Sequence, residues 1–170
     1  MNSDQKTVAV GAASGVICMA LAVWGLYTVM PNPGVIDMAE RLAFALQLNV
    51  VALVPLFILL ISVGNQRFFS NAIDPLRHEE SQKMEVDGRV VENTLEQQFV
   101  FLVGTLALTT LVPPGMLKVI PALVTIFITA RVLFWIGYRI HPLYRAPGMA
   151  ATAYMNLGII LTVLYLKLFI

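Results

Sequence analysis

Charged residues are scarce in this sequence. Asp, Glu, Lys and Arg together make up 12% of its 170 residues, whereas 58% of the residues are hydrophobic. A soluble globular domain carries about 25% charged residues, so this composition excludes an ordinary soluble domain. The chain length fits a single domain. We therefore expect a polytopic membrane protein that contacts the lipid bilayer.

Cysteine, histidine and surplus basic charge are also nearly absent. Cys18 is the only cysteine, which excludes an intrachain disulfide. His78 and His141 stand alone in polar segments, and neither HExxH nor Cys-x-x-Cys occurs, so we expect no metal site. No glycine-rich phosphate-binding loop occurs. A net charge of +1 leaves no basic footprint for nucleic acid.

Long apolar runs follow one another along the chain, separated by polar or proline-rich breaks. A membrane-crossing helix needs about 20 apolar residues. The third run is too short unless its charged first turns, residues 89–98, are also helical. The expected fold class is all-α: an integral membrane helical bundle of five transmembrane helices. The predicted spans are Val8–Met30, Leu42–Val63, residues 89–112, Val119–Tyr138 and Gly148–Leu166.

Local signals refine these spans. The small residues of Gly11–Gly15 would let another helix approach closely. Pro31–Gly34 ends the first helix, because two prolines and a glycine do not continue it. Asn49 is expected to face the bundle interior, where its amide finds a partner, and Pro55 is expected to kink the second span.

Two polar segments, 64–88 and 139–147, hold most of the charge outside the spans, and we expect that charge to be solvated. With five spans, both segments lie on the same side as the N-terminus. That side carries seven Lys and Arg residues, against three on the other side. The positive-inside rule therefore places the N-terminus and both loops in the cytoplasm.

A charged stripe enters the third span on one side. At about 100° per residue, Arg89, Glu92, Asn93 and Glu96 share a quarter to a third of the helix circumference. Arg131 is the only charge inside the run Val119–Tyr138. We therefore predict that Glu96 or Glu92 pairs with Arg131. Such a pair would either hold two helices together or mark a functional site.

These polar residues are expected to form a cluster that opens toward the cytoplasmic side. A set of carboxylate, amide, phenol and guanidinium groups suits a small zwitterionic ligand, because the planar guanidinium binds carboxylates bidentately. An arginine beside a thiol would also stabilise the reactive thiolate. The members of the cluster are Arg89, Glu92, Asn93, Glu96, Arg131, Tyr138 and Arg145.

From the second span to the C-terminus, the chain resembles the membrane-associated proteins in eicosanoid and glutathione metabolism, the MAPEG family. It also looks like the mattrin-type members, which carry extra N-terminal membrane helices. Three features carry the resemblance. Phe69–His78 is similar to the family's Phe-x-Asn-x-x-Asp-x-x-Arg segment, and Arg89-x-x-x-Asn93-x-x-Glu96 matches the family's second-helix signature. The third feature is the spacing of Arg131, Tyr138 and Arg145, ending in Arg145-Ala146-Pro147.

The resemblance implies a homotrimer that binds glutathione as co-substrate between neighbouring protomers, near the cytosolic face. It divides the chain into an N-terminal tail with an extra helix, residues 1–38, and a four-helix domain, residues 39–170. The extra helix would pack outside the four-helix core. Arg145 would lie beside the glutathione sulfur and lower its pKa. The residues implied to contact or orient glutathione are Arg89, Asn93, Glu96, Arg131 and Tyr138.

Three functions remain open at this point. The first is a glutathione transferase or peroxidase that acts on lipophilic electrophiles. The second is a non-catalytic membrane assembly or trafficking protein of the same fold. It is favoured by Phe134, Glu92 and Ala150, where active or prostaglandin-synthase-like members have other residues. The third, a small transporter or channel subunit gated by Glu96 and Arg131, is disfavoured because no inverted repeat is visible.

Overall fold

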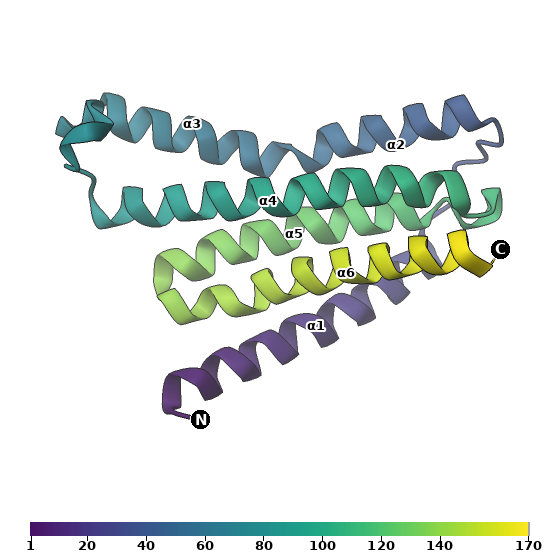
Figure 1. The fold of residues 1–170 in the computed structure, drawn as a ribbon, viewed down its shortest axis with the longest axis horizontal. Coiled ribbons are helices and arrows are strands. Elements are labelled where there is room, and N and C mark those ends of the chain that lie inside the picture. Colours follow the sequence, from purple (N-terminus) through teal and green to yellow (C-terminus); the bar gives the residue numbers. More distant parts are fainter. Residues whose placement is uncertain (170) are drawn as a thin grey trace.

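The computed structural model describes residues 1–169, apart from the side chain of Pro75, and the regular structure in this range is entirely helical. The long helices run roughly side by side in an elongated bundle, with α1 crossing the others obliquely (Figure 1). The α-helices are α1 (Ser3–Val29), α2 (Met38–Ala52), α3 (Val54–Phe68), α4 (Gln82–Leu111), α5 (Val119–Ile140) and α6 (Ala146–Phe169). Short 3-10 turns are η1 (Asn71–Ile73), η2 (Pro75–Arg77), η3 (Pro114–Met116) and η4 (Pro142–Arg145).

Within residues 1–169, four helical segments are long and apolar enough to cross a membrane, and α4 is a fifth long helix packed among them. This arrangement supports the predicted all-α, multi-pass membrane bundle. The four segments are Ser3–Val29, Met38–Phe68, Pro114–Ile140 and Pro142–Phe169. Within Met38–Phe68 the chain bends where α2 ends and α3 begins, with Pro55 in the first turn of α3. The predicted kink is thereby confirmed.

The predicted loop boundaries are wrong. The segment between 64 and 88 is helical at both ends, because α3 continues to Phe68 and α4 already begins at Gln82. Ser81 accepts a hydrogen bond from the Met84 backbone N–H, which caps the start of α4. α4 therefore extends two turns beyond the predicted span, and the charged residues of those turns lie on a helix with one face buried.

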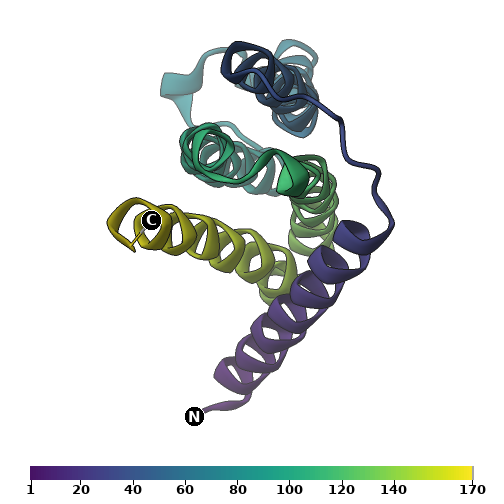
Figure 2. The ribbon, with the colours of Figure 1, turned by 90° about the vertical axis from the view of Figure 1, so that its right-hand side faces the viewer.

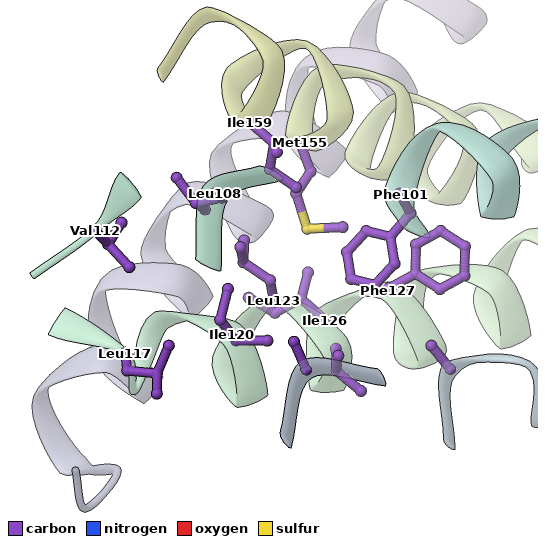
Figure 3. Packing of buried hydrophobic residues seen from close by; sticks show 13 residues of the cluster. Phe101, Leu108, Val112, Leu117, Ile120, Leu123, Ile126, Phe127, Met155 and Ile159 are labelled. Carbon is purple, nitrogen blue, oxygen red and sulfur yellow. The ribbon is translucent and has the colours of Figure 1, made fainter. Parts of the chain in front are cut away.

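The hydrophobic core lies where α2, α4, α5 and α6 meet. The rings of Phe101 and Phe127 stack with centroids 4.4 Å apart, and the Met155 side chain of α6 points toward them (Figure 3). Asn49 of α2 points into this core and donates a hydrogen bond to the Thr105 hydroxyl at 3.0 Å. Asn49 therefore lies inside the bundle, as predicted.

A buried arginine connects α2 to the end of α4. The Arg41 guanidinium donates to the backbone carbonyls of Thr109 and Val112. The last carbonyls of a helix have no partner within the helix. A cationic donor here satisfies them and also interacts favourably with the negative end of the helix dipole. Arg41 thus serves as a C-terminal cap supplied from a neighbouring helix.

α1 lies outside the bundle of the other helices and contacts mainly α6 and α5 (Figure 2). The contact is closest at Gly15, where an added Cβ would lie 2.2 Å from the Pro147 carbonyl oxygen. A Cβ added at Gly11 would lie 3.3 Å from the side chains of Ala146 and Pro147. The small residues of α1 therefore permit the close approach that the sequence predicts, and the extra helix packs on the outside.

Candidate functional site

Asp87, in the second turn of α4, is a polar side chain that connects several helices. Its carboxylate is fully buried, with 0% exposure, and accepts hydrogen bonds from three side chains on two neighbouring helices. Arg139 Nε and Trp135 Nε1 of α5 donate to Oδ1, each at 2.7 Å, and Gln66 Nε2 of α3 donates to Oδ2 at 2.7 Å. Arg139 Nη2 also donates to Oδ2, which completes an ion pair. This Asp87 cluster ties α3, α4 and α5 together at the end of the bundle that carries η1 and η2.

Asp87 precedes the apolar part of α4 in the chain. Two opposing effects act on the pKa of its carboxyl. Burial alone would raise the pKa of this carboxyl, because a charge is poorly solvated there. The hydrogen bonds from Arg139, Gln66 and Trp135 outweigh burial and hold the pKa below its usual range. Asp87 is therefore an ionised partner of Arg139.

Arg131 lies inside the bundle with 0% exposure, and its hydrogen-bond partners among the described residues are all neutral. Nη1 donates to Asn93 Oδ1 of α4 at 2.9 Å, and Nη2 donates to the Gly148 carbonyl of α6 at 3.1 Å and to the Thr152 hydroxyl. The guanidinium also lies over the Phe134 ring, 4.6 Å from its centroid. One side chain thus joins α4, α5 and α6.

The predicted ion pair between Arg131 and Glu96 or Glu92 is wrong. Both glutamates are exposed on the outer side of α4, whereas Arg131 is enclosed and bonds to Asn93 instead. The physical reason is the rotation of α4 about its own axis. Asn93 faces α5, and the two carboxylates point away from the bundle.

Tyr138 and Arg145 lie together near Arg89. The Arg145 guanidinium is 5.0 Å from the centroid of the Tyr138 ring and donates to the Pro142 carbonyl at 2.5 Å. The Tyr138 phenol is also near enough to interact with Arg89, which is exposed and pairs with Glu85 at 2.8 Å. Hence Arg89, Tyr138 and Arg145 form a small group at the rim of the bundle. Asn93 and Arg131 lie inside it, and Glu96 lies apart on the outer face.

Asp87 was predicted to be a solvated loop charge and was not among the candidate site residues. The available signal was its position: Asp87, Val90 and Thr94 are spaced by three and four residues and all are buried. Extending the helical pattern two turns before Arg89 would have put Asp87 on the inner face. Its partners Gln66 and Arg139 lie 21 and 52 residues away in the chain, so no local pattern identifies them.

These features define a class: a multi-pass helical membrane protein with buried polar contacts between helices and a group of arginine and tyrosine side chains at one end. The sequence profile of the MAPEG family matches residues 45–165, and the chain belongs to this family.

Curated relatives agree with that assignment. Transmembrane protein 79 of Mus musculus is 23% identical over 145 residues, which cover 84% of this chain and 37% of that protein. Transmembrane protein 79 of Bos taurus is 24% identical over 150 residues, which cover 87% of this chain and 37% of that protein. The chain thus spans little more than a third of the length of these relatives, which are the mattrin-type members. No solved structure matches the chain significantly.

Proposed function

We propose that this chain is a non-catalytic MAPEG protein, a membrane assembly or trafficking component that forms a homotrimer. MAPEG proteins are generally trimeric. The observation that carries the proposal is the outer face of α4, where Glu92 and Glu96 are exposed and form no ion pair within residues 1–169. In this proposal the N-terminus and the segments 64–88 and 139–147 are cytoplasmic.

Exposed carboxylates on a membrane helix need a partner. An Asp at the centre of a membrane helix costs about 2.5–3.5 kcal/mol in insertion, so acidic residues in spans almost always face protein or water. Leu95, Phe99 and Val103 are exposed next to Glu96 on the same helix. A neighbouring protomer would cover this mixed apolar and acidic surface and remove the carboxylates from lipid.

The inward-facing residues support a structural role. Two of the residues implied to bind glutathione, Asn93 and Arg131, bond to each other. The other hydrogen bonds of Arg131 are also made within the chain, to Gly148 and Thr152. The likeness to Transmembrane protein 79 points in the same direction.

The oligomeric state of the protein in detergent tests whether the outer face of α4 is a subunit boundary. We expect the unaltered protein to run as a trimer in size-exclusion chromatography with light scattering. Glu96→Leu combined with Glu92→Leu removes the carboxylates that a neighbour would bind, so we expect it to run mainly as a monomer. Glu79→Leu, in the exposed polar loop, should leave the trimer intact. If the double variant remains a trimer, this face of α4 is not the subunit boundary.

A second candidate is a glutathione-dependent transferase or peroxidase acting on lipophilic electrophiles. It is favoured by the arrangement of Tyr138 between Arg89 and Arg145. Arg145 forms no ion pair with an acidic residue within residues 1–169. In this candidate Arg89 and Tyr138, with Glu96 from a neighbouring protomer, would bind glutathione. Arg145 would hold its sulfur as the thiolate, the form that attacks an acceptor.

Titration calorimetry with glutathione separates the two candidates. The non-catalytic protein is expected to give no binding heat and no conjugation to a chloronitrobenzene acceptor. The enzyme would give both, and Arg145→Ala would abolish the rate, whereas Arg77→Ala, at an exposed loop arginine, would not. A saturable glutathione signal that requires Arg145 would therefore overturn the non-catalytic proposal.

A further inference from the structure

A large apolar cavity lies between α1 and the rest of the bundle. Its volume is about 630 Å³, within the range of about 300–1,000 Å³ that small-molecule sites occupy. Side chains of α1, α4, α5 and α6 line it, and none of the described lining residues is charged. The walls include Tyr27, Val112, Leu123, Gly158 and Tyr165. Val112 and Leu123 are among the core residues drawn in Figure 3.

The cavity follows from the way α1 docks. Gly15, the only buried residue of α1, rests on Pro147 at the start of α6. From that contact the two helices diverge toward their C-terminal ends (Figure 2). Their C-terminal halves both line the cavity, Tyr27 from α1 and Tyr165 from α6. The space therefore lies between membrane-crossing helices, where the surrounding medium is lipid.

The rim of the cavity is basic. The Lys118 ammonium lies 4.6 Å from the centroid of the Tyr27 ring, which is part of the cavity wall. Lys118 also immediately precedes α5, whose first residue, Val119, lines the cavity. An ammonium at the rim of an apolar cavity attracts an anionic group.

We propose that this cavity binds an acyl chain of an anionic phospholipid, with the phosphate held at Lys118. The occupant is amphipathic because the walls are apolar while the rim carries a positive charge. The bound lipid would hold the C-terminal half of α1 to the bundle, a role independent of whether the chain binds glutathione.

Filling the cavity tests the proposal. The full chain is reconstituted in vesicles of equal phosphatidylglycerol and phosphatidylcholine, extracted, and its retained lipid is measured by native mass spectrometry. We expect the unaltered protein to retain phosphatidylglycerol in several-fold excess. A Cβ at Gly158 meets no atom within 4 Å, so Gly158→Phe places its ring in the cavity, and we expect it to lose the retained lipid. Gly25→Phe is the matched control, because Gly25 has equally open space but does not line the cavity.

Removing the rim charge tests the headgroup separately from the acyl chain. Lys118→Gln is expected to retain lipid but to lose the excess of phosphatidylglycerol over phosphatidylcholine. The proposal is overturned if Gly158→Phe retains as much lipid as Gly25→Phe. It is also overturned if the unaltered protein retains the two phospholipids equally, or if Lys118→Gln keeps the preference.

Discussion

Asp87→Asn is expected to lower the free energy of unfolding by about 3 kcal/mol. Removing one partner of a buried ion pair costs about 3–5 kcal/mol, because the other charge stays without compensation. The lower end applies because the Arg139 side chain is 31% exposed and regains some hydration. The Asn amide has one acceptor oxygen, so it cannot accept all the hydrogen bonds that the two carboxylate oxygens of Asp87 accept. Thermal or chemical unfolding in detergent, followed by circular dichroism, measures the loss.

Glu85→Gln is the matched control for this substitution. Glu85 lies two residues before Asp87 on the same helix, but its pair with Arg89 is exposed on both sides. Exposed ion pairs contribute about 0–1 kcal/mol, so the control should unfold almost as the unaltered protein does. Equal unfolding midpoints for Asp87→Asn and Glu85→Gln would refute the assignment of Asp87 as the centre of this polar cluster.

The contribution of Asp87 should also depend on pH. Its pKa is lower in the folded than in the unfolded chain, so the stabilisation is present above the ordinary value of 3.8 and is lost as the pH falls below it. The free energy of unfolding of Asp87→Asn should therefore differ most from that of the unaltered protein at neutral pH. The difference between the two should become smaller in acid.

Arg131→Ala is expected to destabilise the bundle by about 3 kcal/mol or more. Truncating a large buried side chain to Ala costs about 2–5 kcal/mol through the cavity that remains. The variant also leaves Asn93 and Thr152 without the donor that joins α4 to α6. Arg131→Met keeps most of the side-chain volume but not the hydrogen bonds. Its stability should therefore lie between that of Arg131→Ala and that of the unaltered protein.

Arg77→Ala controls for the loss of an arginine. Arg77 is 69% exposed and pairs with Asp74 three residues away, so its removal should change stability by less than about 1 kcal/mol. The comparison uses unfolding midpoints in the same detergent. If Arg131→Ala unfolds with the midpoint of Arg77→Ala, Arg131 does not hold the three helices together.

Helical periodicity and composition are local properties, and they predicted the features that depend on them. The scarcity of charge predicted a membrane bundle, Pro55 predicted the bend between α2 and α3, and Gly11–Gly15 predicted the close contact of α1. Asn49 was also predicted correctly, because an amide inside an apolar span has almost no alternative to an internal partner. The order of motifs around Arg89–Glu96 and Arg131–Arg145 identified the MAPEG family, which the family profile confirms.

Only the tertiary structure decided which partner each charge meets. Arg131 bonds to Asn93 and not to Glu92 or Glu96, and Asp87 pairs with Arg139, 52 residues away. Spacing along a helix shows which residues share a face, but the rotation of that helix about its axis depends on how α3, α4, α5 and α6 pack. A rotation of one residue, about 100°, exchanges a buried carboxylate for an exposed one. The charged contacts therefore follow from the packing of the whole bundle, while the helices themselves follow from the sequence of each segment.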